Sequence, residues 1–568
     1  MEAEAREDFD QITRRDGYHV GESHRRDGGQ SPATQVVVGL AASIVEHALF
    51  AVELRDQQRG RRREHEGEVR RGEDVYHVVG AHAPQERRAV EELVCDRPQV
   101  LDTPEPPERR GKRRIDGQKG GFERRLALEA FEQARELHGL PAQESAERRA
   151  DQKHAHRLSG AANDYDPLMQ MISDARFVLL GEATHGTHEF YRERARITRR
   201  LIEEKGFDAV VLEADWTDAY RANEFVLGKS EDRTAQKSLS GFTRFPRWMW
   251  RNADFRDLVG SIRSFNDSRQ PEAKKVGIYG MDLYGLAESL KEVTEFLRRT
   301  EPEAAKLASK RYGCFGSYGD NPPQYGYDVA SGIKKSCEKQ AAEQFQEMEQ
   351  RFAAWQNNPQ RERSDDLFSA YQSARVVKNA EAYYRLSYNR SFSTWNLRDN
   401  HMADTIHALT GYLDALGNSK SKIVVWAHNT HQGDARMTDM GETGELNVGY
   451  LMRKATDGNS VLIGFTTYMG RVMAASEWGL EGVTMRVRPA LPGSYSRLFH
   501  DSGIPNFLLI FRGNERLTRE LSTTRLERAI GVIYKPRTEH QSHYFGAKMS
   551  KQFDAIIHFD TTSAVKPF

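Results

Sequence analysis

The chain has 568 residues, enough for one large domain or several smaller ones with a sizeable hydrophobic core. Its 83 basic and 83 acidic residues cancel, which argues against nucleic acid or an anionic membrane as a partner and favours a small neutral substrate. Cys95, Cys314 and Cys337 are too few and too scattered for a disulfide framework or a CxxC metal site, so we expect a reducing cytoplasm.

Residues 1–155 differ in composition from the rest of the chain. Up to residue 150 they contain 24 arginines but two lysines, and all seven tryptophans lie from Trp216 onward. A mixed-charge segment with few aromatic residues buries too little apolar surface to offset its chain entropy. We therefore expect a disordered extension or a mis-called start.

The beginning of the chain carries no secretory signal pattern. One apolar stretch, at 35–52, approaches the length of a membrane span but contains Glu46 and His47. A buried or amphipathic helix is the favoured interpretation, and we expect no membrane association.

From residue 156 to 568 the pattern becomes that of an α/β domain. Apolar, β-branched runs alternate with segments of helical periodicity, which favours a mostly parallel central sheet flanked by helices. The segment 188–206 has helical periodicity and ends at Gly206, a residue suited to a helix C-cap. Strands are predicted at 176–182, 209–215, 275–282, 422–429, 460–468, 507–511 and 529–534.

The region from about 284 to 415 interrupts this alternation with long polar helical runs, which predict a helical insertion. Within it, 313–328 is rich in turn-forming residues and tyrosine, so we expect a loop that lines a pocket or packs on the surface. Its aromatic residues would form an apolar wall for a large ligand or pack locally; they are Tyr312, Phe315, Tyr318, Tyr325 and Tyr327.

Ionisable residues stand at the ends of four predicted strands. They are Glu182 and His185 after the first, Glu213 and Asp215 in the second, Asp282 in the third, and His428 and His431 after the 422–429 strand. Because the carboxyl ends of parallel strands meet at one edge of a sheet, we expect these groups to converge. Taken singly, each has a structural explanation as a helix cap, a buried turn or a hydrogen bond to loop backbone.

Such a cluster suits hydrolysis. A carboxylate that holds one imidazole nitrogen lets the other accept a proton from water near neutral pH. The remaining histidines can donate to the oxyanion or to the leaving oxygen. Arg194, about two turns into the helix after His185, is expected to add a fixed positive charge or to anchor Glu213, unless it is simply a basic residue on an exposed face.

Several other enzyme classes lose support. The sequence contains no GxSxG elbow, no GxxxxGK phosphate loop and no Rossmann fingerprint. A divalent metal site is the competing interpretation, although HExxH is absent. Its ligands for zinc or manganese would be Glu182, His185, Glu213, His428 and His431.

Six segments together resemble one known family. In chain order they read LGEATHGTHEFY, VVLEADW, IYGMDLYGL, VVWAHNTHQGDAR, NVGYLMR and IGFTTYMGRV, and they resemble the erythromycin esterase family from about Asp164 to the C-terminus. The resemblance implies an α/β fold with a helical lobe over the active-site cleft. It also implies hydrolysis of an ester, in the named members the macrolactone of erythromycin-type antibiotics, without a metal or other cofactor.

Carried over by motif, the resemblance makes His185 the general base and Glu182 its neighbouring carboxylate. The catalytic set would be completed by Glu213, His428, His431 and Arg194, and we expect Asp282 and Tyr318 to bind substrate. The prediction is thus a cytoplasmic carboxylic ester hydrolase with a small-molecule ester substrate and a role in macrolide resistance. The alternatives are a metal-dependent hydrolase or peptidase that uses the same cluster, and a non-catalytic binder of macrolide-like ligands.

Overall fold

The computed structural model describes residues 153–270, 273–358, 360, 362–389, 392–417 and 419–568. The predictions for residues 1–152, which include the apolar stretch at 35–52 and Cys95, fall outside this part of the chain. Among the helices that are described, none combines the length and apolar character needed to cross a membrane.

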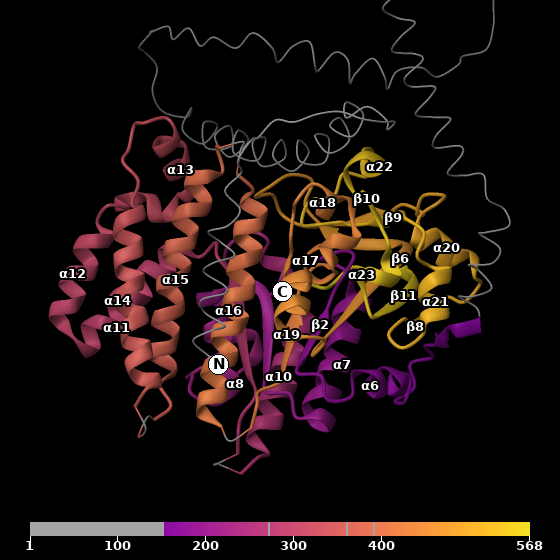
Figure 1. Ribbon diagram of the computed structural model, residues 1–568, viewed down its shortest axis with the longest axis horizontal. Helices are drawn as coiled ribbons and strands as arrows, with labels where there is room; N and C mark the ends of the chain where they lie inside the picture. Colours follow the sequence, from indigo (N-terminus) through magenta and orange to yellow (C-terminus); the bar gives the residue numbers. More distant parts are fainter. Residues whose placement is uncertain (1–152, 271–272, 359, 361, 390–391, 418) are drawn as a thin grey trace, which may run out of the picture. The chain divides into compact units, whose positions relative to one another are not determined.

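A nine-stranded, mostly parallel sheet forms the centre of the described domain (Figure 1). Its strands are ordered β1-β8-β11-β6-β2-β5-β3-β4, and β7 pairs with β6. The pairings from β11 through β6, β2, β5 and β3 to β4 are parallel, whereas β1, β7 and β8 pair antiparallel. The strands are β1 His156–Arg157, β2 Phe177–Leu180, β3 Ala209–Asp215, β4 Gly277–Asp282, β5 Ile423–Trp426, β6 Ser460–Ala474, β7 Val483–Val487, β8 Asn506–Ile510 and β11 Ala555–Thr562. The predicted α/β fold is confirmed.

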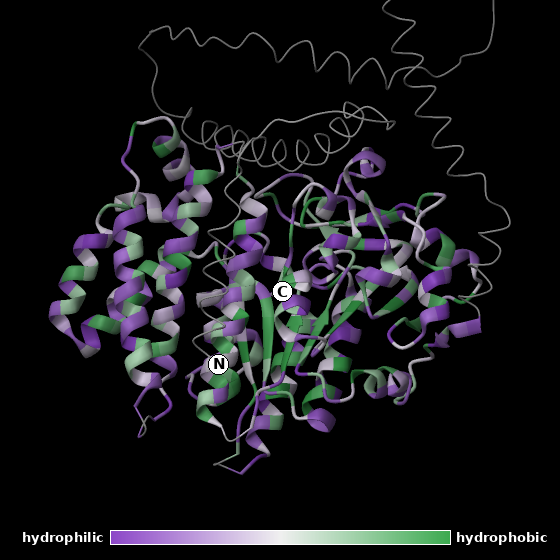
Figure 2. Cartoon of the chain, in the orientation of Figure 1, coloured by the Kyte–Doolittle hydropathy of each residue, from purple (hydrophilic) through white to green (hydrophobic). Residues whose placement is uncertain are grey.

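Alternate residues of the central strands enter two different cores, one on each face of the sheet. Val178 and Val210 share a core with residues of α7 (His188–Lys205), α8 (Trp216–Leu227) and α10 (Ala253–Asp267). Leu179 and Val211 belong to the opposite core, which includes residues of the helical region beyond 286. Because both faces are covered, the central strands are apolar over most of their length, and they form the hydrophobic centre in Figure 2.

Further short helices and one small sheet surround the central sheet. The helices are α6 Asp166–Ile172, α9 Ala235–Ser238, α17 Asn429–Gln432, α18 Asp439–Glu442, α19 Val448–Thr456, α20 Tyr495–Asp501, α21 Glu515–Glu520, α22 Glu539–Ser542 and α23 Met549–Gln552. Two strands, β9 Arg525–Arg528 and β10 Tyr544–Ala547, pair antiparallel in a sheet of their own, and the 3-10 turns η1 Leu239–Gly241, η2 Arg247–Met249 and η4 Ala435–Met437 lie in connections. Helix α7 ends as predicted, with Gly206 in the left-handed region at φ 68°.

The region predicted as an insertion folds into helices that we call the helical lobe, on the left of Figure 1. They are α11 Leu286–Thr300, α12 Pro302–Tyr312, η3 Gly316–Asp320, α13 Pro322–Ala330, α14 Glu338–Gln356, α15 Asp365–Leu386 and α16 Thr394–Leu416. The prediction of a loop over 313–328 is wrong, because η3 and α13 occupy most of it and Pro322 begins α13 at a position where proline is favourable. Tyr312, Phe315 and Tyr325 are buried in the lobe core, so they pack locally.

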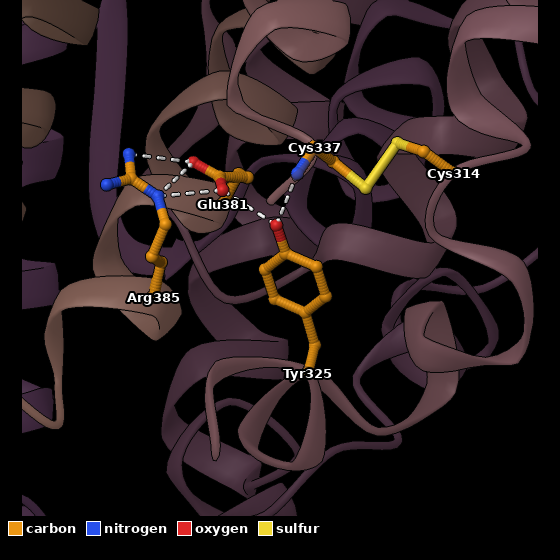
Figure 3. Close-up of a disulfide and its surroundings, with 5 residues drawn as sticks. All are labelled: Cys314, Tyr325, Cys337, Glu381 and Arg385. Atoms are coloured by element: carbon orange, nitrogen blue, oxygen red, sulfur yellow. Dashed lines mark hydrogen bonds and ion pairs between the residues drawn. A yellow bond between two sulfur atoms is a disulfide. The ribbon is translucent and has the colours of Figure 1, made fainter. Parts of the chain in front are cut away.

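A disulfide joins Cys314 and Cys337 across 23 residues of the helical lobe (Figure 3). The sequence predicted no disulfide framework, yet these two cysteines are paired, because Cys314 after α12 lies beside Cys337 at the start of α14. The Tyr325 hydroxyl accepts a hydrogen bond from the Cys337 backbone N–H and donates one to Glu381, each at 2.7 Å. Arg385 pairs with the same Glu381 carboxylate, at 2.9 Å.

Two strand predictions fail near the C-terminus. The segment 529–534 is not a strand; Ile530 and Ile533 form isolated bridges to Thr184 and Ala475. These partners lie in the turn after β2 and at the end of β6, so the segment crosses strand ends and never runs along one strand. The second failure is one of omission: β1, β7, β9, β10 and β11 were not predicted, and β11 lies between β8 and β6.

Candidate active site

The predicted strand-end residues meet at one edge of the central sheet. Strand β5 comes late in the chain, yet it lies between β2 and β3, so the order of connections reverses at this point. In open α/β sheets such a point is where sites form. All six predicted catalytic residues join one network of hydrogen bonds and ring contacts here; they are Glu182, His185, Arg194, Glu213, His428 and His431.

Glu182 lies between a histidine and an arginine. His185 Nδ1 is 2.9 Å from Glu182 Oε1, and the Arg194 guanidinium donates to Glu182 Oε2 at 2.6 Å. Arg194 is fully buried between the rings of Tyr191 and Trp426, 4.6 and 4.5 Å from their centroids. The expectation that Arg194 anchors Glu213 or lies on an exposed face is therefore wrong. It anchors Glu182.

The Glu182 contact decides how His185 carries its proton. Because a carboxylate accepts at Nδ1, that nitrogen bears the hydrogen in the neutral ring, and Nε2 keeps its lone pair. Nε2 makes no hydrogen bond to another residue in the described part of the chain, and His185 is 7% exposed. The ring is thus oriented by one nitrogen and available as a base at the other.

Glu213 enters the network through an irregularity in strand β3. The register between β3 and β4 shifts between Leu212 and Asp215, and a bulge of this kind redirects a side chain. Gly280 on β4 makes room for it, since a Cβ there would lie 2.5 Å from the Ala214 carbonyl oxygen. Glu213 then accepts the His428 backbone N–H at 2.8 Å.

His428 is both a structural cap and a free donor. It is the N-cap of α17, where its Nδ1 accepts from the Thr430 backbone N–H at 3.3 Å and lies 2.9 Å from the Thr430 hydroxyl. The proton therefore sits on Nε2, which is buried without a well-aligned hydrogen bond, although the Ala183 carbonyl lies near the ring. Burial, reinforced by His185 at a ring distance of 4.9 Å, holds the pKa of His428 well below its usual range, so the ring is neutral at pH 7.

His431 is held by residues from the helical lobe. Its Nδ1 lies 2.9 Å from Asp399, its ring stacks on Trp395 at 4.4 Å, and its Nε2 is 3.3 Å from Glu213 and 3.0 Å from Arg398. The ring can donate to Glu213 as a cation or accept from Arg398 when neutral. Burial lowers the pKa of His431, but the Asp399 and Glu213 carboxylates outweigh it and raise it to about 10, which favours the cation.

Arg398 joins three strand-end residues and was not predicted from sequence. Its guanidinium binds Asp282 at 3.0 and 2.7 Å, Glu213 at 2.9 Å and His431 at 3.0 Å. Burial would raise the pKa of Glu213, but His431 and Arg398 hold it well below its usual range. Arg398 lies on α16, in a polar helical run with no strand-end signal, so the sequence offered no reason to single it out.

The two predicted substrate-binding residues have protein partners. Asp282 is buried at the end of β4 and forms its ion pair with Arg398, so it belongs to the cluster. Tyr318 lies in the helical lobe, where its hydroxyl donates to Asp328 at 2.6 Å, and it makes no contact with the catalytic residues in the described chain. A substrate-binding role for either residue stays a prediction.

The cluster is nearly closed to solvent, and two surface cavities lie elsewhere in the described chain. A surface cavity of about 840 Å³ is lined by residues of α9, α10 and Phe568, and one of about 390 Å³ lies between α11 and α12. Neither is lined by a residue of the cluster. Within the described ranges, no three His, Cys, Asp or Glu residues are grouped so as to hold a metal ion.

Comparison with known proteins places the chain among esterase-like sequences. The erythromycin esterase family model matches residues 202–562, a range that includes Glu213, His428 and His431. The putative hydrolase YbfO of Bacillus subtilis is 22% identical over 72% of this chain and 89% of its own length. Erythromycin esterase type II of Escherichia coli is 20% identical over 71% of this chain and 93% of its own length.

Solved structures agree at the level of the fold. A Bacillus cereus protein has a TM-score of 0.62 at 20% identity, and covers 75% of this chain and 99% of its own. A mutant of the erythromycin esterase EreC in its open conformation has a TM-score of 0.52 at 17% identity, over 71% of this chain and 95% of its own.

Proposed function

We propose that this chain, which belongs to the erythromycin esterase family, hydrolyses a carboxylic ester with a water molecule that His185 activates. The family and the curated relatives point to a hydrolase. The ester specificity and the mechanism are our proposals, and they rest on the geometry of the cluster.

The observation that carries the proposal is the Glu182–His185 pair. Glu182 holds Nδ1, so Nε2 can take a proton from water as that water attacks the ester carbonyl. The imidazolium formed in this step is stabilised by the same carboxylate. Arg194 is too deeply buried to touch substrate, so its part is to hold Glu182 in position.

A second group suits the oxygen of the attacked carbonyl. His428 is neutral, its Nε2–H makes no well-aligned hydrogen bond in the described chain, and its ring lies 4.9 Å from that of His185. A fixed donor beside the base can stabilise the negative charge that develops on the oxygen. When the tetrahedral intermediate collapses, the bond between the carbonyl carbon and the ester oxygen breaks. The alkoxide that leaves takes the proton that the His185 imidazolium received from water.

The substrate proposed is a lactone or a related ester, with erythromycin-type macrolactones as the first compounds to test and macrolide resistance as the resulting role. Support comes from the family and from the relative named an erythromycin esterase. The expected cytoplasmic location stays a prediction, and the Cys314–Cys337 disulfide argues against it because such bonds are rare in reducing compartments.

Incubation with macrolides and simple esters, followed by mass spectrometry, tests the proposal. Hydrolysis adds the mass of one water to the ligand. The His185→Ala variant is expected to fold but to lose turnover by at least about a hundredfold, the low end for removal of a general base. Near wild-type activity of that variant on a cleaved ester would refute the mechanism.

The ligand mass separates one alternative from the proposal, and elemental analysis with chelation separates the other. A non-catalytic binder would retain the ligand at unchanged mass. A metal-dependent hydrolase that uses Glu182, His185, Glu213, His428 and His431 would contain stoichiometric metal and lose activity on chelation. We expect activity to survive chelation, because these side chains already bind one another or Arg194 and Arg398.

A further inference from the structure

Asn429, the residue after His428, ties four parts of the candidate site together. Its backbone N–H donates to the Glu182 carbonyl at 2.8 Å. Its side-chain amide pairs with the backbone of Phe465 on β6, donating at 2.8 Å and accepting at 3.2 Å. A Cβ on Gly181 would overlap the Asn429 amide oxygen, so glycine before Glu182 makes this packing possible.

The remaining hydrogen of the Asn429 amide goes to Glu527 on β9. The distance from Asn429 Nδ2 to Glu527 Oε1 is 3.1 Å, and Glu527 is 1% exposed. With this bond, both hydrogens and the oxygen of the Asn429 amide have partners. The orientation of Asn429, and with it the turn that carries His428, thus depends on a carboxyl group that neither the sequence analysis nor the proposed mechanism uses.

Glu527 has no cationic partner among the described residues. Arg528 follows it in the chain but pairs with Glu539 at 3.0 Å. Burial raises the pKa of Glu527 to about 8, and hydrogen bonds from Asn429 and Gln552 oppose this without reversing it. The titratable groups on the elements around β9 bind elsewhere: His543 to the Ala529 carbonyl, Tyr544 to Arg528, His500 to Asp560, His428 to Thr430 and His431 to Asp399.

A neutral carboxyl group also fits two unpaired atoms. Glu527 Oε2 and Gln552 Oε1 are both buried without a hydrogen-bond partner, although the Gln552 amide lies beside the carboxyl. A proton on Oε2 would remove one of these unpaired acceptors. A buried acceptor left unpaired costs about 1–3 kcal/mol, and more when the group is charged, so burial favours the neutral acid.

From these contacts we infer that Glu527 is a positioning residue: as a neutral acid it holds the Asn429 amide against β6, and thereby fixes His428 relative to Glu182 and His185. The inference rests on the proposed function for its kinetic consequence, but the positioning itself is independent of the substrate. Glu527 touches no reacting atom in this arrangement and acts through Asn429.

Three substitutions test the inference, with Glu203→Gln on the exposed face of α7 as the control. Glu527→Gln keeps a neutral side chain of the same length, so kcat on a cleaved ester is expected to stay within about threefold of wild type. Glu527→Ala removes the hydrogen bond, and kcat is expected to fall at least about tenfold with KM nearly unchanged. If Glu527→Ala does not fold, Glu527→Asp replaces it, since the shorter side chain withdraws the carboxyl from Asn429.

A readout that needs no substrate keeps the two proposals apart. The rate at which diethyl pyrocarbonate modifies His428, followed by peptide mass spectrometry, is expected to rise at least threefold in Glu527→Ala or Glu527→Asp and to be unchanged in Glu527→Gln. Wild-type modification rates in both disruptive variants would overturn the positioning role. If wild type cleaves no ester, the proposed function fails while this comparison still decides the role of Glu527.

The pH dependence of thermal unfolding tests the neutral form. A carboxyl with a raised pKa in the folded state contributes stability that is complete below its ordinary pKa and is lost as pH rises to about 8. Wild type should therefore lose more Tm than Glu527→Gln between pH 5 and 8.5, by at least about 3 °C. Equal losses in the two proteins would show that Glu527 is already ionised, and would overturn the inference of a neutral acid.

Discussion

The two halves of the candidate site are built differently. The sheet edge provides Glu182, His185, Glu213 and His428 from strand ends whose positions follow from backbone pairing. The helical lobe provides Arg398 and its neighbours on α16, which reach the site only because that helix packs beside β4 and α19. The proposed reacting groups thus lie at the sheet edge, and much of the charge that holds these side chains in position lies on the helical lobe.

This difference separates reacting groups from the groups that support them. The groups with a free nitrogen, His185 and His428, are on the sheet side. Arg398 and Asp399 have their polar atoms engaged by Glu213, Asp282 and His431. We therefore expect substitution of His185 to change turnover alone, and substitution of the charged groups that hold the site to change turnover and stability together.

The largest effect is expected from Arg398→Ala on the lobe side. It leaves the buried carboxylates of Asp282 and Glu213 without their shared cation, and breaking a buried pair typically costs about 3–5 kcal/mol of stability. The Tm of thermal unfolding and kcat should both fall, and kcat should fall by at least about a hundredfold. Arg299→Ala, an exposed arginine on α11, is the control and should change neither. An active, stable Arg398→Ala protein would contradict the division between the halves.

Arg194→Met sharpens the comparison on the sheet side. The variant fills the space between Tyr191 and Trp426 but removes the hydrogen bond to Glu182 Oε2. We expect kcat to fall at least about tenfold because Glu182 loses the partner that orients it, and stability to fall by about 1.5–3 kcal/mol, typical of a hydrogen bond to a charged group. Steady-state kinetics measure this, with the exposed Arg192→Met as control. Unchanged turnover would mean that Glu182 needs no second partner.

Asp399→Asn should shift the pH dependence of kcat/KM and leave the proposed base, His185, unchanged. Asp399 and Glu213 raise the pKa of His431 to about 10, so His431 contributes stability that is complete below its ordinary pKa and is lost as pH rises through about 10. Without Asp399 the ring loses its proton at lower pH. Between pH 7 and 10, the alkaline decline of kcat/KM should begin at least one pH unit earlier than in wild type. Superimposable pH profiles would argue against a cationic His431.

The smallest effect on activity is expected from the lobe disulfide. Cys314→Ser combined with Cys337→Ser opens a loop of 23 residues, which should lower stability by about 2–4 kcal/mol. Because neither cysteine contacts the cluster, kcat should stay within about twofold of wild type. Unfolding curves and kinetics in the presence and absence of a thiol reductant check both statements. A large loss of kcat would show that the outer lobe and α16 act as one unit.

The sequence predicted the sheet half of the site well because its signals are local. A β-branched run specifies a buried strand, and the residue that follows it must lie at the strand end. Glu182, Glu213 and His428 therefore converge as predicted. Helix α7 also ends at Gly206 as predicted, because glycine readily adopts the positive φ of a helix C-cap. The GEATHG and AHNTH motifs contain the two histidines with a free nitrogen.

Tertiary structure alone decided which charged groups meet. Arg194 was expected to add a fixed positive charge, to anchor Glu213 or to lie on an exposed face, but it is buried and binds Glu182. Arg398 reaches Glu213 across 185 residues of sequence, Glu527 reaches Asn429 across 98, and the Cys314–Cys337 bridge depends on the fold of the lobe. Helix and turn patterns indicate where such polar residues lie along the chain. Tertiary packing determines which of them meet when they are far apart in sequence, and no local pattern encodes that packing.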